Sequence, residues 1–312
     1  MKINRPRHGS LQYWPRKRAA KFLPRVNWKV LNSQKPLKGF IGYKAGMMSA
    51  IAKDNTPDSM TKGKEIAMPV TIIECPTMKI LSVRFYKYGI VANEILAENI
   101  DKELKKKIKL PKKAIKKIDE IKPETYDDIT IIAYSQVKKT NIKKNPDIIE
   151  IGLNGNVHEK IKFIKENLGK ELSVSDFFQK GQLVDLKGLT KGKGLQGPVK
   201  RFGINLKFHK SEKGVRRPGS LGPWHPARVI FRVAMAGQLG LFTRTLYNNR
   251  IMDIGKAENK FKGIKNYGDI KTDYIIVRGS VQGPAKRQLI ITAPLRATKT
   301  QLKKNFDLLR LR

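Results

Sequence analysis

Three glycines, Gly192, Gly194 and Gly197, have the spacing G-x-G-x-x-G, which in many proteins brings backbone close to phosphates. In a dinucleotide-binding fold this motif opens a helix, and an acidic residue follows about 20 residues later. Here Pro198 follows the third glycine directly, and the nearby acid is Glu212. These features argue against a dinucleotide site. We interpret the motif as a flexible turn whose N–H groups can approach phosphates, because glycine has no Cβ to hold them away.

Basic residues surround this glycine motif and could neutralise the phosphates. They are Lys191, Lys193, Lys200 and Arg201. The wider stretch 190–228 contains seven glycines and nine Lys or Arg residues before Arg228, with few residues that could be buried. A loop of this length is unusual inside a compact domain. We therefore expect residues 190–228 to form a long loop that becomes ordered against a partner.

A tryptophan, Trp224, lies in the Gly- and Pro-rich sequence PGSLGPWHP, with Arg216, Arg217 and Arg228 on either side. An aromatic ring at a loop tip can stack on RNA bases or wedge against them. The alternative is a tryptophan buried by the body of its own fold. We favour stacking on RNA, with the neighbouring His225 as a hydrogen-bond donor. A catalytic role for this histidine is disfavoured, because no triad of partners is visible in the sequence.

The N-terminal sequence PRHGSLQYWPRKRA combines aromatic and basic residues and contains two prolines, Pro6 and Pro15. Its members are Arg5 (immediately before it), Arg7, His8, Tyr13, Trp14, Arg16, Lys17 and Arg18. A charge run is usually a solvated surface, but this one has no acids and is interrupted by proline. Readers of duplex DNA generally present a helix to the major groove, whereas extended basic arms with aromatics suit folded RNA. We predict a nucleic-acid-binding arm over residues 1–38.

The charge of the whole chain supports a polyanionic partner. It has 312 residues with 65 Lys+Arg and 26 Asp+Glu, a net charge of +39. Residues 1–53 hold 13 basic residues and no acid, and residues 187–250 hold 14 basic residues and one acid. Residues 91–185 hold 19 basic and 16 acidic residues, as an ordinary soluble domain would. The basic flanks thus resemble polyanion-binding surfaces.

Several other functions are excluded by composition. The single cysteine, Cys75, cannot form an intrachain disulfide, and we expect it to be a small buried residue. The four histidines are widely separated and, with one cysteine, do not make a zinc site: His8, His158, His209 and His225. No cofactor or metal is expected. The sequence shows neither a secretory signal nor an apolar run long enough to cross a membrane.

Hydrophobic residues make up 40% of the chain, enough to form a folded core. Short β-branched and aromatic runs predict strands. These are residues 39–49 (a strand with a tight turn), 69–75, 78–87, 129–135, 147–153, 182–189, 229–235, 273–281 and 287–293. Helix-forming composition predicts two helices over 92–122, separated at Pro111, and one over 157–169 with Gly169 as its stop. Strands joined by Gly-rich turns favour a barrel.

Taken in order, the motifs resemble a known family. They are PRHGSLQYWPRKRA, GFIGYKAGM, VDLKGLTKGKGLQGPVKRFG, GPWHPARV, AGQLGLFTRT and RGSVQGPAKRQLI, and they run across nearly the whole chain. This order is similar to that of the universal large-subunit ribosomal proteins of the L-three family. The N-terminal arm, the large insert and the short C-terminus resemble the archaeal type. Glu212 departs from a uniformly basic loop, so a phosphate contact is doubtful at that position.

The resemblance implies a mixed α/β fold: a β-barrel related to those of translation factors, with an inserted α/β domain, a long basic loop and an extended N-terminal arm. The expected domains are an extension at 1–38, a barrel body at 39–87 and 173–312 containing the RNA-penetrating loop 190–228, and an insert at 88–172. It also implies a structural, non-enzymatic component of the large ribosomal subunit, in the cytoplasm. Its partners would be large-subunit ribosomal RNA of the 23S type and neighbouring ribosomal proteins, with no membrane and no small-molecule substrate.

In the family, the tryptophan-bearing loop approaches the peptidyl-transferase region, and the protein acts early in subunit assembly. Combining composition with the resemblance, we predict the following RNA-binding residues: Arg5, Arg7, His8, Arg16, Lys17, Arg18, Lys44, Lys191, Lys193, Lys200, Arg201, Arg216, Arg217, Trp224, His225, Arg228, Arg244, Lys286 and Arg287. Two alternatives remain. An RNA-modifying enzyme would need a nucleophile–base pair or a cofactor loop, and a DNA-compacting protein would prefer duplex DNA.

Overall fold

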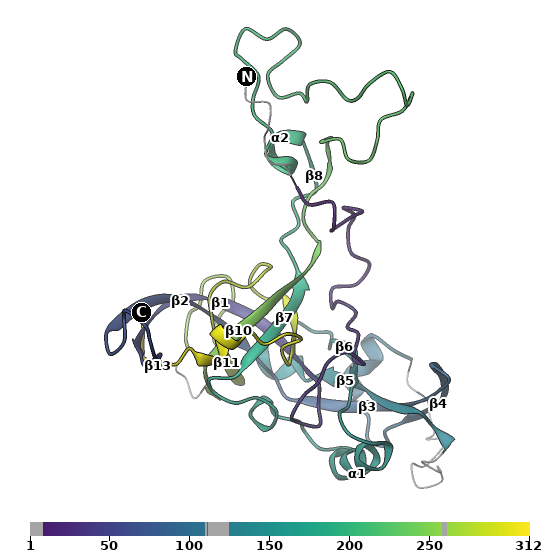
Figure 1. Cartoon of the computed structure of the whole chain (residues 1–312). Helices are drawn as coiled ribbons and strands as arrows, with labels where there is room; N and C mark the ends of the chain where they lie inside the picture. Colours follow the sequence, from purple (N-terminus) through teal and green to yellow (C-terminus); the bar gives the residue numbers. More distant parts are fainter. Residues whose placement is uncertain (1–8, 110, 112–124, 258–260) are drawn as a thin grey trace. The chain divides into compact units, whose positions relative to one another are not determined.

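The computed structural model describes residues 9–109, 111, 125–257 and 261–312. The fold is mixed, with mostly β-sheet and few helices (Figure 1). The predicted mixed, β-rich class is confirmed at this level. Contacts divide the chain into two compact units, which are described separately below. One contains the described residues up to Phe22 together with Leu189–Arg244, and the other contains Leu23–Gly188 and Thr245–Arg312.

The longest strand, β1 (Gly39–Asp54), organises the larger unit. It pairs antiparallel with β2 (Glu65–Glu74), with a register shift between Lys44 and Gly46. The predicted tight turn is wrong, because the glycines of this segment serve close packing inside a continuous strand. A Cβ at Gly42 would lie 2.6 Å from the side chain of Ile73, nearer than real Cβ contacts permit.

Seven strands form the main sheet in the order β12-β7-β10-β11-β2-β1-β13. The members not yet bounded are β7 (Leu183–Leu189), β10 (Thr243–Lys256), β11 (Asp273–Arg278), β12 (Gln288–Thr292) and β13 (Phe306–Leu311). β12 pairs antiparallel with β7 and also with β1, from Gly39 opposite Thr292 to Tyr43 opposite Gln288. Because β12 pairs with both β7 and β1, the first six strands of this order form a closed ring of pairings. The seventh strand, β13, pairs with residues 50–54 of β1.

A second sheet has four antiparallel strands in the order β4-β3-β5-β6. Their bounds are β3 (Met78–Lys87), β4 (Ile90–Leu96), β5 (Asp128–Ser135) and β6 (Ile148–Gly152). Helix α1 (Val157–Asn167) packs on the core through the predicted apolar face: Ile164 is buried, and Ile161 and Leu168 are partly buried. The shorter elements of this unit are η1 (Lys102–Lys106), η4 (Val137–Thr140), η5 (Val174–Asp176) and α3 (Lys299–Lys303).

One hydrophobic core joins both sheets and α1. Phe40 of β1, Phe85 of β3 and Ile164 of α1 belong to the same buried cluster. A polar contact also links the sheets: the hydroxyl of Tyr43 donates to Asp147 at 2.6 Å and lies 2.7 Å from the hydroxyl of Ser135. Burial and the neighbouring carboxylate raise the pKa of Tyr43. Such a buried polar contact can persist only because its groups are hydrogen-bonded.

Two predicted elements are wrong in the described residues. Helices were expected over 92–122, but the described part of this segment forms the end of β4 and then η1. Residues 110 and 112–124 lie outside the described residues. Pairing of β4 with β3 overrides helix propensity here, aided by the ion pair of Arg84 with Glu94 at 3.0 Å. The expected strand 229–235 is absent, because its backbone turns on itself through a Val233-to-Ile230 hydrogen bond of 3.1 Å.

The remaining predicted strands are confirmed with small shifts of their ends. Five strands among the described residues were not predicted: β4, β10 and β13, and the two-residue strands β8 (Leu195–Gln196) and β9 (Gly237–Gln238). β10 is the most instructive, because its sequence mixes Asn, Arg, Asp and Gly with apolar residues and shows no clean alternation. Pairing with its neighbours, which the local sequence does not reveal, keeps this segment extended.

Candidate nucleic-acid interface

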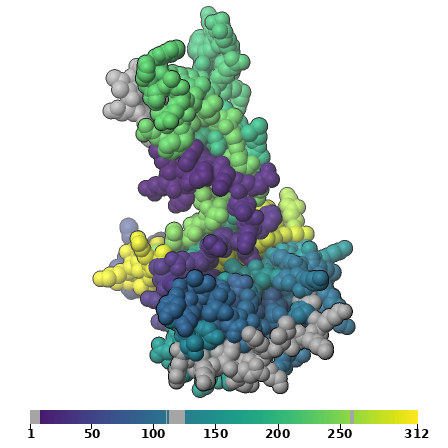
Figure 2. All heavy atoms as spheres, turned by 90° about the vertical axis from the view of Figure 1, so that its right-hand side faces the viewer, coloured from purple at the N-terminus to yellow at the C-terminus, as the bar shows by residue number. Residues whose placement is uncertain are grey.

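Residues 9–22 of the arm and residues 189–244, which include the basic loop, are far apart in the sequence but form one compact unit. The rest of the predicted arm, residues 23–38, belongs to the larger unit, where Leu31 and Leu37 are buried. The backbone N–H of Ala19 donates to the carbonyl of Leu241 at 3.0 Å. The rings of Trp14 and Phe231 lie 5.4 Å apart, centroid to centroid. In Figure 2 the purple arm lies against the green loop. The two segments that were predicted to bind polyanions thus contact each other through a backbone hydrogen bond and an aromatic pair.

Arg16 fastens the arm to the loop. Its guanidinium lies 4.2 Å from the centroid of the Phe202 ring, a cation–π geometry. It also donates to the carbonyl of Arg201 at 3.3 Å. Arg244 makes a comparable contact, lying 4.6 Å from the ring of Tyr13. Both arginines were predicted to bind RNA, and the structure places both on aromatic rings of their own unit.

Arg201 stabilises the base of the loop. Its guanidinium donates to the carbonyls of Gln238 at 3.0 Å and Met235 at 2.9 Å, and burial lowers the pKa of this group. Gly237 makes room for it, since a Cβ there would lie 2.8 Å from the guanidinium carbon. Arg201 therefore orders the loop backbone.

The glycine motif begins a short, regular substructure. β8 (Leu195–Gln196) pairs with β9 (Gly237–Gln238), and Gly194 has a positive φ of 63°. A short helix, α2 (Pro198–Phe202), starts directly after the motif, which the proline had led us not to expect. Proline is well suited to the first helical position because its missing N–H would be unsatisfied there. The five-residue helix is not preceded by a long strand, so the dinucleotide interpretation gains no support.

The predicted loop tip carries an exposed tryptophan. Trp224 is 86% exposed, which contradicts burial of its side chain in the body of the fold. Its basic neighbours in the loop are exposed as well: Arg216, Arg217, His225 and Arg228. Lys17, Arg18, Lys191, Lys193 and Lys200 also lie on the surface of this unit. Glu212 is the single acidic residue in the segments 9–22 and 189–244.

Three predicted residues lie in the other unit and differ among themselves. Lys44 is only 8% exposed, and its ammonium donates to the carbonyls of Val281 at 2.5 Å and Gly283 at 3.2 Å. Lys286 is exposed, whereas Arg287 is half-buried with its pKa lowered by burial. Arg5, Arg7 and His8 lie outside the described residues. Direct RNA contact at each of these positions stays a prediction.

Sequence reasoning missed the aromatic residues that fasten the arm to the loop. Phe202 and Phe231 looked like ordinary apolar residues, because nothing near them in the sequence indicates a contact with the arm. The available signal was the pairing of aromatics with arginines in both segments. Such a signal suggests cation–π contacts but does not say which arginine meets which ring.

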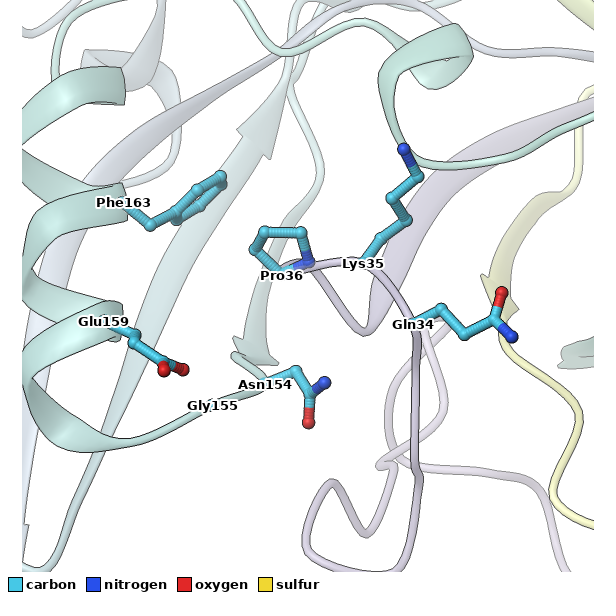
Figure 3. A pocket seen from close by; sticks show the side chains of 7 residues that line it. All are labelled: Gln34, Lys35, Pro36, Asn154, Gly155, Glu159 and Phe163. Carbon is cyan, nitrogen blue, oxygen red and sulfur yellow. The ribbon is translucent and has the colours of Figure 1, made fainter.

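One pocket of about 170 Å³ lies in the larger unit, between α1 and the segment 34–36 (Figure 3). It is lined by Gln34, Lys35, Pro36, Asn154, Gly155, Glu159 and Phe163. The carboxylate of Glu159 accepts the backbone N–H of Asn156 at 3.1 Å and caps α1. Glu159 thus serves the first turn of the helix.

Cys75 is buried, as predicted. Among the described residues, no group of three His, Cys, Asp or Glu could hold a metal ion. The helices within the same residues are too short or too polar to cross a membrane.

An acid-poor unit with exposed cations and exposed aromatic rings has the pattern that is typical of nucleic-acid-binding proteins. The family described as Ribosomal protein L3 matches residues 1–309. Large ribosomal subunit protein uL3 of Methanocaldococcus jannaschii is 41% identical, covering 97% of this chain and 95% of its own length. The protein of the same name from Methanococcus aeolicus is 42% identical (95% and 93%), and that from Methanobrevibacter smithii is 41% identical (94% and 92%).

The chain therefore belongs to the ribosomal protein L3 family. The resemblance seen in its motifs is confirmed, and the relatives named here are archaeal. As a member of this family it is a structural, non-enzymatic ribosomal component, which agrees with the sequence-based expectation.

Proposed function

We propose that this chain is a structural constituent of the large ribosomal subunit that binds large-subunit ribosomal RNA through its arm and basic loop. The observation that carries this proposal is the joining of both segments into one unit with a single acid, Glu212, and a tryptophan that is largely exposed. The names of the relatives as large-subunit proteins support it. Its site is the ribosome in the cytoplasm, among neighbouring ribosomal proteins, without a cofactor.

Within this unit the residues divide by task. The guanidinium groups of Arg16, Arg201 and Arg244 contact rings and carbonyls of this unit and hold the arm and loop together. These arginines therefore contribute to binding partly by maintaining the conformation of the unit. The exposed cations, among them Arg216 and Arg217, meet phosphates. RNA is favoured over duplex DNA because the smaller unit presents extended backbone and aromatic rings, and the one helix among its described residues has five residues.

Trp224 and His225 buttress RNA near the peptidyl-transferase centre, and the protein supports early assembly of the subunit. This part of the proposal rests on the family resemblance of the sequence GPWHP. The exposure of Trp224 supports it, because an exposed ring is available for stacking.

We further propose the finer architecture expected of the family. The main sheet is a barrel body that lies within 39–87 and 173–312, supported by the pairing of β12 with both β7 and β1. Within this range β3 (Met78–Lys87) belongs to the four-stranded sheet instead. Residues 88–172 are an inserted α/β domain, supported by α1 and the strands β4, β5 and β6. Residues 1–38 are the N-terminal extension, and residues 190–228 penetrate the RNA.

Fractionation of a cell lysate on a sucrose gradient, before and after a high-salt wash, tests this function. We expect the chain to sediment with the large subunit and to stay bound in moderate salt, because an arm and loop threaded through RNA cannot leave without unfolding it. Sedimentation at the top of the gradient, or release by mild salt, would show a peripheral factor instead.

A further inference from the structure

A second aromatic tip lies in the basic loop, apart from Trp224. The backbone N–H of Lys207 donates to the carbonyl of Val215 at 2.9 Å, which closes a small loop between them. Inside it, the N–H of Ser211 donates to the carbonyl of Phe208 at 2.9 Å. Lys213 and Gly214 then turn the chain with positive φ angles of 61° and 98°. Residues 207–215 are therefore a closed tip, which we call the Phe208 tip.

The Phe208 tip presents two aromatic rings side by side. The ring centroids of Phe208 and His209 lie 4.2 Å apart, with their planes tilted by 45°. Phe208 is 66% exposed. A single exposed apolar side chain is ordinary on protein surfaces. Here, however, the exposed ring is paired with a second ring on a backbone held by two hydrogen bonds, so the surface it offers is preformed.

Cations surround these rings. Lys207, Lys210 and Lys213 lie within the tip, all exposed, and Arg216 and Arg217 follow it directly. The one acid, Glu212, leaves the tip itself with two net positive charges, from three lysines less one glutamate. Charged residues are depleted from the centres of protein–protein interfaces. Aromatic rings surrounded by lysines are instead typical of proteins that bind single-stranded nucleic acid. In those proteins the bases stack on the rings, and the cations contact the phosphates.

We propose that Phe208 and His209 form a stacking site for an unpaired nucleotide of large-subunit ribosomal RNA. The base lies on the Phe208 ring, and the lysines of the tip contact the adjoining phosphates. The site accepts different bases, because every base has a π-face and the tip offers no rigid set of donors for its edges. This inference rests on the proposed RNA-binding function and assigns to it a second contact, independent of Trp224.

The test compares the full-length chain with three variants on large-subunit ribosomal RNA transcribed from the genome that encodes it. Phe208→Ala removes the ring, and Phe208→Tyr keeps it. Leu195→Ala is the matched control, because Leu195 is 79% exposed in the same unit and has no ring. Affinity is measured at several salt concentrations, and chemical probing reports the reactivity of each unpaired base. Thermal unfolding verifies that each variant folds.

We expect Phe208→Ala to weaken binding by about 5- to 100-fold, the effect of losing one stacked base. One or two unpaired bases become more reactive, while the salt dependence stays the same because no cation is removed. Phe208→Tyr and Leu195→Ala retain the wild-type affinity and reactivity pattern.

Suppose that the RNA affinity of the wild type falls steeply with salt concentration, while Phe208→Ala has the wild-type affinity and reactivity pattern. That result overturns the stacking site but leaves the proposed function intact. An effect of Phe208→Ala that arises only when other ribosomal proteins are present also overturns it, since the tip would then contact protein. A wild-type chain that does not bind this RNA overturns the proposed function and the stacking site together.

Discussion

At the scale of single residues, the exposed side chain of Trp224 contributes little to folding stability but is available for binding. Its side chain has almost no contact with the folded body, so it adds little to folding. Burying such a large ring would normally contribute several kcal/mol, whereas this one remains available for a partner. The free energy that its ring can contribute is therefore realised only on binding.

We predict that Trp224→Ala changes the free energy of unfolding by no more than about 0.5 kcal/mol, as for other surface substitutions. In the ribosome the same change impairs translation, because a stacking contact is lost. Chemical denaturation of the isolated chain and a translation assay with mutant ribosomes measure the two effects. A loss of about 3–5 kcal/mol on denaturation would show that this ring belongs to a core after all.

Arginine residues of the smaller unit have two distinct uses. Arg16 and Arg201 are engaged by rings and carbonyls of the unit, whereas Arg216 and Arg217 are exposed. Guanidinium suits the first use because it is weakly hydrated and stacks on aromatic faces while still donating hydrogen bonds. Replacing an arginine of the first kind changes the shape of the interface, and replacing one of the second kind changes its charge.

At the scale of elements, a buried carboxylate fastens a long loop to the sheet. Glu74, at the end of β2, accepts the backbone N–H groups of Lys271 and Thr272 at 2.8 and 3.0 Å, and also the hydroxyl of Tyr267. Burial, together with the charge of Glu74, raises the pKa of Tyr267 above its ordinary value of 10.0. The folded protein therefore keeps this phenol protonated where the unfolded chain would ionise it.

This difference predicts a loss of stability in alkali. Below pH 10 the tyrosine is neutral in both states, and its contribution is fully present. Above pH 10 the unfolded chain releases the proton and the folded chain retains it, so stability falls by up to about 1.4 kcal/mol per pH unit. Tyr267→Phe should cost about 1–3 kcal/mol at pH 7, where Glu74 loses a donor, and should reduce the alkaline slope.

Urea denaturation of the wild type and Tyr267→Phe at pH 8, 9, 10 and 11 measures this slope. Tyr43 has a raised pKa for the same reasons and remains in both proteins, so its contribution cancels in the comparison. Parallel stability curves for the two proteins across this range would contradict the proposed role of Tyr267.

At the scale of the whole molecule, the net charge of +39 dominates the behaviour of the free chain. Such a charge repels itself, and a bound polyanion relieves that repulsion. The charge is also concentrated in segments almost without acids, so binding should release many counterions from the RNA at once.

We therefore predict a steep salt dependence for binding of the isolated chain to large-subunit ribosomal RNA. If eight phosphates are neutralised, the slope of the logarithm of the binding constant against the logarithm of the salt concentration is about −6 to −7. Filter binding over a range of potassium chloride concentrations measures it, and competition with duplex DNA tests the preference for RNA. A flat salt response would be incompatible with the arm and loop as phosphate-binding segments.

The sequence by itself determined the chemical character of this protein. Charge is a sum over residues, so the acid-poor flanks and the balanced middle could be found without a structure. Strands such as β3 and β5 were predictable because β-branched and aromatic runs favour extended backbone locally. The motifs in their order were also sufficient for the family, since they span nearly the whole chain.

Only the tertiary structure decided which residues meet. It joined the arm to the loop through Arg16 and Phe202, buried Lys44 beneath two carbonyls, and made a strand of Ile90–Leu96, where composition favoured a helix. Each of these outcomes depends on a partner distant in the sequence. Local propensity is worth a few tenths of a kcal/mol per residue, and pairing or burial against such a partner outweighs it.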